Sequence, residues 1–103
     1  MTYEDTIRNS LVEKYADFNQ LKESMFKTIM DEFSTRREKE NGQLDATMQA
    51  ALNNVINKLQ NKYQKGDEIW LWIDNPDQPF AETWGYAIIR NGEPTAWEIL
   101  GRR

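Results

Sequence analysis

The sequence predicts an α+β protein in which an N-terminal antiparallel helical hairpin packs on a C-terminal three-stranded antiparallel sheet. In residues 2–65, apolar side chains recur at steps of three and four, which is the spacing of one helix face. After Gly66 they alternate, which is the spacing of a strand. A chain of 103 residues is expected to form one domain, with the hairpin in 1–65 and the sheet in 66–103.

The first predicted helix is long. Residues 2–41 contain no Gly or Pro, and Thr2 with Asp5 three positions later forms a capping box. Asn41-Gly42 supplies a left-handed stop. A continuous helix here would extend roughly 57 Å at 1.5 Å per residue, so it either breaks, for example near Asn19, or projects beyond its partner helix. Its apolar stripe consists of Ile7, Leu11, Tyr15, Phe18, Leu21, Met25, Phe26, Ile29 and Phe33.

The second predicted helix covers residues 44–64 and ends before Gly66. A short turn separates it from the first helix, so the two are expected to run antiparallel. Its apolar stripe consists of Leu44, Met48, Ala51, Leu52, Val55, Ile56, Leu59 and Tyr63.

Three strands are predicted, at residues 68–74, 83–90 and 95–100, in the order first, second, third. Residues 75–81 contain Pro76 and Pro79 and are expected to form a loop. Asn91-Gly92 is a strong signal for a two-residue hairpin. Pro94 cannot donate a hydrogen bond to a ladder, which places the third strand at an edge.

The hairpin register predicts an aromatic sheet face. With Arg90 opposite Glu93, Tyr86 lies opposite Trp97 and Trp84 opposite Ile99. Small residues allow a helix to approach closely, so we expect the helical hairpin on the face that carries Gly85, Ala87, Ala96 and Leu100. The second face then gathers Trp70, Trp72, Trp84, Tyr86 and Trp97.

Such an aromatic face needs a cover. Each of the five side chains has on the order of 150–250 Å² to bury, whereas the largest apolar patch on a monomer is typically about 300–600 Å². The cover is a foreign partner, a second copy, or a part of the same chain. The projecting first helix or the proline-bearing loop could serve as this internal cover, and the tryptophans would then be ordinary core.

The residue types exclude most catalytic chemistry. The chain has no Cys and no His, which removes disulfides, thiolate nucleophiles, the usual metal ligands and the usual proton shuttle. A carboxylate-only site would need a cleft and one raised pKa. We therefore expect no enzyme, no cofactor and no metal, and an acidic rim rather than an active site at Asp74, Asp77, Glu82 and Glu98.

The charge pattern points to a protein partner. The net charge is −4, and residues 66–103 hold seven acidic and three basic side chains. A nucleic-acid partner is unlikely, because phosphate recognition needs the opposite sign. There is no membrane-spanning run and no signal-peptide pattern, so we expect a cytoplasmic protein.

These observations predict a non-catalytic protein-binding module. The aromatic face would contact a partner with a basic surface, and the acidic rim would favour it through association rate and specificity. In composition, though not in any motif, the chain is similar to bacterial immunity proteins, antitoxins and phage-encoded inhibitors. One alternative is a structural homo-oligomer, such as a dimer, joined by the aromatic face or the projecting helix. Another is a small-ligand binder or carboxylate-only enzyme.

Overall fold

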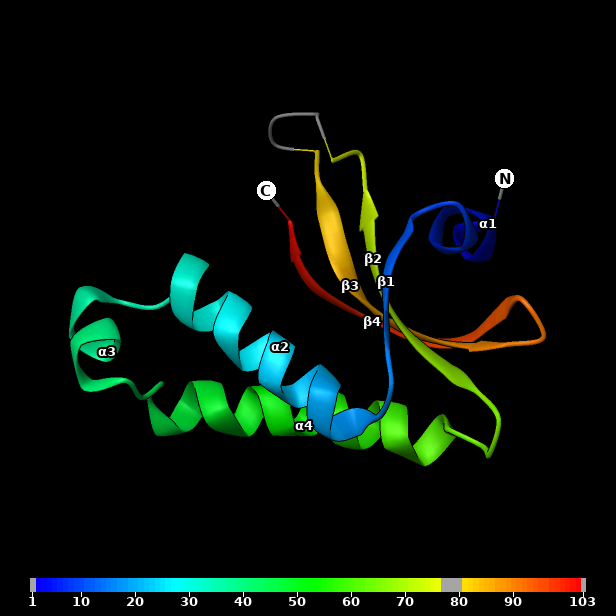
Figure 1. Cartoon of the computed structure of the whole chain (residues 1–103). Helices are drawn as coiled ribbons and strands as arrows, with labels where there is room; N and C mark the ends of the chain where they lie inside the picture. The colour runs from blue at the N-terminus through cyan, green and yellow to red at the C-terminus, as the bar shows by residue number, and fades with distance from the viewer. Residues whose placement is uncertain (1, 77–80, 103) are drawn as a thin grey trace.

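The computed structural model describes residues 2–76 and 81–102, and it has the predicted α+β class. Four strands form one antiparallel sheet in the order β1-β2-β3-β4 (Figure 1). Asp77 lies outside the described residues. The elements are α1 (Tyr3–Arg8), β1 (Leu11–Tyr15), α2 (Phe18–Glu32), α3 (Arg36–Asn41), α4 (Ala46–Lys62), β2 (Glu68–Asp74), β3 (Thr83–Arg90) and β4 (Glu93–Arg102).

The long first helix and the three-stranded sheet were wrong predictions. Residues 2–41 form α1, β1, α2 and α3 instead. Asn9 ends α1. The Asp17 carboxylate caps α2 by accepting a hydrogen bond from the backbone N–H of Gln20. Between them, Leu11 to Tyr15 pair with β2. The physical reason is that β1 pairs with the β2 edge that a three-stranded sheet would leave open.

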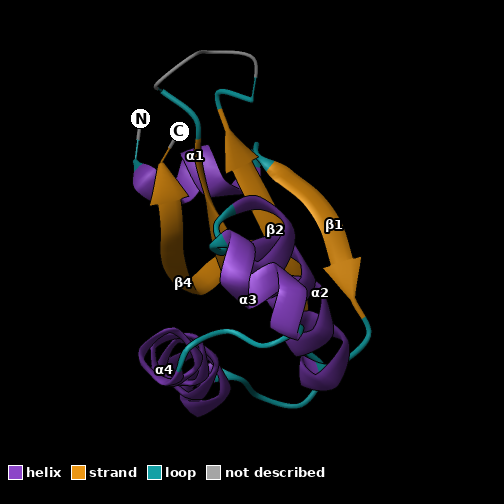
Figure 2. Cartoon of the chain, turned by 90° about the vertical axis from the view of Figure 1, so that its left-hand side faces the viewer, coloured by secondary structure: helices purple, strands orange, loops and turns teal. Residues whose placement is uncertain are grey.

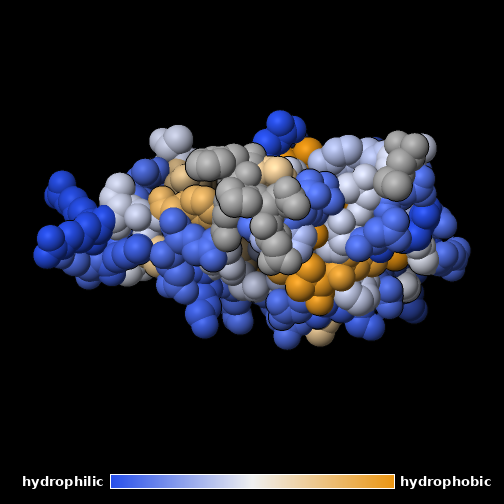
Figure 3. Space-filling view, turned by 90° about the horizontal axis from the view of Figure 1, so that it is seen from above, coloured by the Kyte–Doolittle hydropathy of each residue, from blue (hydrophilic) through white to orange (hydrophobic). Residues whose placement is uncertain are grey.

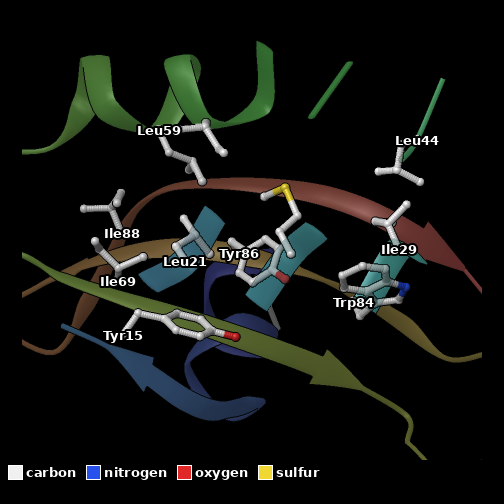
Figure 4. Close-up of a cluster of buried hydrophobic side chains, with 11 residues drawn as sticks. Tyr15, Leu21, Ile29, Leu44, Leu59, Ile69, Trp84, Tyr86 and Ile88 are labelled. Atoms are coloured by element: carbon white, nitrogen blue, oxygen red, sulfur yellow. The ribbon is translucent and has the colours of Figure 1, made fainter. Parts of the chain in front are cut away.

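The sheet is covered on both faces (Figure 2). On one face lie α2 and α4, and on the other lies α1. Buried side chains of the first face and its helices form the helix-side core (Figure 4). This core contains Tyr15, Leu21, Met25, Ile29, Leu44, Ile56, Leu59, Ile69, Trp84, Tyr86 and Ile88. The second face holds the smaller α1-side cluster, which consists of Ile7, Trp72, Ala87 and Ile89.

The predicted register holds at the turn and fails beyond it. Arg90 pairs with Glu93 as expected, but the register shifts between Ile89 and Ile88, so Thr95 becomes an extra residue in β4. Pro94, which cannot donate to the ladder, immediately precedes this bulge. A slip of one residue turns every later side chain to the opposite face.

The single aromatic face was therefore a wrong prediction. Trp97 lies opposite Ala87 and not opposite Tyr86. Trp84 and Tyr86 belong to the helix-side core, whereas Trp72 belongs to the α1-side cluster. Trp70 and Trp97 pack around that cluster. Gly85 and Ala87, expected to face the helices, lie on the α1 side, because they follow the alternation of β3.

A second shift lies between Trp84 and Gly85, which pair with Gly101 and Ile99. The backbones approach closely at this bulge. A Cβ added to Gly85 would lie 1.9 Å from the Glu98 carbonyl oxygen. Only glycine fits there without a shift of the backbone.

Candidate functional site

Three of the five aromatic residues predicted to bind a partner are buried. The exposed fraction is 0% for Trp72, 3% for Trp84 and 1% for Tyr86. These three offer no surface to a partner in this structure. Trp70 and Trp97 are half-buried and remain accessible.

The predicted acidic residues do not form one rim. Glu98 lies on the helix side, where its Oε1 is 3.7 Å from Nζ of Lys58. Asp74 ends β2 on the same face as Trp72. Glu82 precedes β3. The sheet therefore separates Glu98 from Asp74.

The α1 helix is the cover of the second sheet face. Ile7 is fully buried against Trp72, Ala87 and Ile89. Burying an isoleucine contributes about 1.5–3 kcal/mol to stability. This internal cover, from the N-terminal end of the segment predicted as the long helix, was one of the alternatives that the sequence left open.

Tyr3 extends the cover towards β4. Its ring stacks on Trp97 with centroids 6.0 Å apart and an interplanar angle of 22°. The same ring meets Trp72 edge-on at 6.1 Å. Partial burial is the main cause that raises the pKa of Tyr3; Arg102 lowers it and Asp74 raises it, so both charges lie near this ring.

Arg8 joins α1 to the β3–β4 turn. Its guanidinium contacts Oδ1 of Asp5 at 2.7 Å and the carboxylate of Glu93. The side chains of Arg8 and Glu93 are both partly exposed, so solvent screens this pair. The pair therefore helps to orient α1 more than it anchors it.

Polar groups beneath α1 are incompletely satisfied. Within the part of the chain that the structure describes, Nε1 of Trp72 and Nε of Arg8 are buried without a hydrogen-bond partner. Nε1 of Trp84, in the helix-side core, is the third such atom. A buried N–H of this kind, as in Trp72, costs about 1–3 kcal/mol.

An exposed apolar surface beside α1 follows β4. We name Tyr3, Trp97 and Ile99 the β4 ridge. Tyr3 is 42% exposed and Ile99 is 41% exposed, whereas Trp97 is half-buried and in contact with Tyr3. Trp97 and Ile99 pair with Ala87 and Gly85, so they point to the α1 side of the sheet. Because β4 is an edge strand, the ridge lies beside an unpaired backbone edge.

A groove lies between α2 and α4. Its volume is about 780 Å³. Met25, Phe26, Leu52 and Ile56 supply its apolar lining, and amide side chains such as Asn53 border it. Elsewhere, the surface seen from above is mostly hydrophilic, with apolar areas of limited extent (Figure 3).

The titratable groups behave as surface charges or as core. Hydrogen bonds lower the pKa values of Asp5, Glu38, Asp67 and Glu68, so these carboxylates are ionised at neutral pH. Burial raises the pKa values of Tyr15 and Tyr86. Among residues 2–76 and 81–102, no three acidic side chains come together as metal ligands.

The chain has no match among protein-family models, curated proteins or solved structures.

None of the helices in the described part of the chain is both long enough and apolar enough to cross a membrane.

Sequence reasoning missed the roles of Tyr3, Ile7 and Arg8. The Thr2–Asp5 capping box was visible and is present in the structure. The missed signal is Asn9-Ser10 directly after Arg8, since Asn and Ser are turn-forming residues. Reading them as a stop would have given a short helix that carries one buried side chain, Ile7.

Proposed function

We propose that this protein is a non-catalytic protein-binding module that contacts its partner through the β4 ridge. One observation carries the proposal: exposed Tyr3 stacks on half-buried Trp97 at the edge strand β4, beside exposed Ile99. Tyr and Trp are the residues most enriched at binding hot spots. An edge strand with an unpaired backbone also allows a partner strand to be added.

The chemistry of the ridge favours a partner with apolar and basic groups. Two carboxylates lie near the ridge: Glu93 pairs with Arg8 of α1, and Asp74 lies near Tyr3. The net charge of the chain is −4. Arg102 moderates this negative field near Tyr3. We therefore expect charge to steer association and the apolar ridge to supply most of the affinity. A cytoplasmic, inhibitor-like or immunity-like role is part of the same proposal.

The ridge can be tested with two exposed side chains of similar accessibility. Ile99→Ser changes the ridge, and Phe26→Ser changes the groove of α2, where Phe26 is 39% exposed. In a pull-down with the immobilised chain as bait, we expect proteins that bind the wild-type chain to be lost with Ile99→Ser and kept with Phe26→Ser. Circular dichroism of both variants checks the fold.

The same experiment can contradict the proposal. Retention that survives Ile99→Ser and also Trp97→Ala would exclude the ridge. Loss with Phe26→Ser alone would move the binding site to the groove between α2 and α4. A groove of this volume is also within the range of small-ligand sites, roughly 300–1,000 Å³.

A further inference from the structure

The attachment of α1 to the sheet rests on few buried contacts. Like α3, it has six residues, and a helix this short is not stable by itself in water. One side chain of α1, Ile7, is fully buried, and Tyr3 is largely exposed. The packing of α1 involves the α1-side cluster, whereas α2 and α4 pack on the larger helix-side core. The α1-side cluster is thus a separate, smaller unit.

We propose that α1 is a displaceable cover, and that the sheet face beneath it receives a short helical segment of a protein partner. The segment carries an apolar side chain in the place of Ile7 and a cation in the place of Arg8. This inference rests on the proposed protein-binding function and adds a second contact site beside the β4 ridge, in which Trp97 and Ile99 remain when Tyr3 leaves with α1. Its first test needs no partner.

The occupant is deduced from what α1 itself supplies. Ile7 fills the space between Trp72, Ala87 and Ile89, and the adjacent Arg8 pairs with Glu93. When α1 leaves, the carboxylate of Glu93 remains at the border of the apolar face. A partner helix with adjacent apolar and basic residues reproduces both contacts.

Trp72 gives a partner an advantage over α1. Its Nε1–H is buried and makes no hydrogen bond to any described residue. A partner segment that presents a carbonyl or hydroxyl oxygen there gains a hydrogen bond that α1 does not make. Displacement of α1 also exposes more of Trp70 and Trp97, which are half-buried around the cluster.

The opening of α1 can be measured by hydrogen exchange of the tryptophan indole N–H groups. Trp72 and Trp84 form a matched pair, since both are buried and the Nε1 of each lacks a partner among the described residues. Local opening exposes groups without global unfolding. We expect Trp72 to exchange at least roughly tenfold faster than Trp84 in the wild-type chain.

Two variants then separate local from global opening. Ile7→Ala should accelerate the exchange of Trp72 at least roughly another tenfold and leave Trp84 nearly unchanged. Val12→Ala, at an exposed site in β1, should change neither rate. Arg8→Gln should give the same selectivity as Ile7→Ala with a smaller effect. Equal rates for Trp72 and Trp84 in every variant would overturn the displaceable cover.

The occupant is tested with a synthetic peptide of residues 1–10 as the probe. Added to the Ile7→Ala chain, this peptide should slow the exchange of Trp72, and a peptide with Arg8→Glu should protect less. No protection by the first peptide would overturn the binding site. If exchange of the Trp72 indole N–H in the wild-type chain instead slows at concentrations at which the solution mass doubles, the occupant is α1 of a second copy. The proposal of a foreign partner is then overturned. We expect Ile99→Ser to abolish binding at the β4 ridge without changing these exchange rates, so the two proposals fail separately.

Discussion

At the scale of single residues, the clearest electrostatic feature is the pair formed by Asp67 and Arg90. The Asp67 side chain is 2% exposed. Its carboxylate accepts hydrogen bonds from Nε of Arg90 at 2.8 Å and from Nη2 of Arg90 at 2.9 Å. It also accepts one from the backbone N–H of Gln64 at 2.8 Å. The bond to Arg90 is the main cause that lowers the pKa of Asp67 below its ordinary 3.8. The pair joins β3 to the turn after α4.

This pair predicts a pH-dependent effect of Asp67→Asn. A carboxyl with a lowered folded pKa stabilises the fold above its unfolded pKa of 3.8, and this stabilisation is lost as the pH falls through the lower folded pKa. We expect Asp67→Asn to lower the free energy of unfolding at pH 7, and the two chains to converge in acid. Denaturant unfolding at pH 7 and along an acid series measures both. Asp31→Asn, on the surface of α2, is the control, and a difference independent of pH would contradict the prediction.

At the scale of elements, local patterns predicted α4 and the three later strands but not β1. Leu11 and Tyr15 are four residues apart, which fits a helix as well as the surrounding stripe. What makes the segment a strand is its pairing with β2, whose residues lie more than fifty positions later. The sequence around residue 11 does not contain that information. The face of Trp97 was missed for a related reason, because a bulge at Thr95 reverses a simple alternation.

The start of α4 gives a prediction at the same scale. The Asp45 carboxylate accepts a hydrogen bond from the Met48 amide at 2.8 Å, which satisfies one of the free N–H groups of the first turn. Replacing such a cap by alanine costs about 1 kcal/mol. We therefore expect Asp45→Ala to lower the melting temperature by roughly 4–8 °C. Asn57→Ala, exposed within the same helix, is the control, and an equal effect of both variants would show that the cap is unimportant.

At the scale of the whole molecule, both faces of the sheet are closed by the chain itself. The helices α2 and α4 cover one face, and α1 covers the other. The molecule is nevertheless elongated and flat: its radius of gyration is 14.0 Å, and its extents are 42 × 34 × 19 Å. A compact domain of this length has a radius of about 13 Å. The open features are the free edges β1 and β4 and the groove between α2 and α4.

Closure of both faces predicts a monomer in solution. The sequence allowed a homo-oligomer because an uncovered aromatic face would need a second copy. In the structure, α1 supplies that cover. Outside the β4 ridge, the exposed large apolar side chains are spread over several elements: Val12, Phe26, Phe33 and Tyr63. Scattered apolar residues of this kind are normal for a monomer.

Light scattering over a hundredfold concentration range tests this prediction. We expect a mass near 12.2 kDa throughout. A mass that doubles with concentration in the wild-type chain and stays single in Ile99→Ser would identify the β4 ridge as a contact between copies, and the foreign partner would no longer be needed to explain its exposure. A doubling that Ile99→Ser leaves intact would instead point to a different surface, such as the groove or an exchanged α1. In a single copy, α1 already covers the second face. A dimer through the ridge or the groove would therefore add contacts, and a dimer through an exchanged α1 would replace one copy's α1 with the other's.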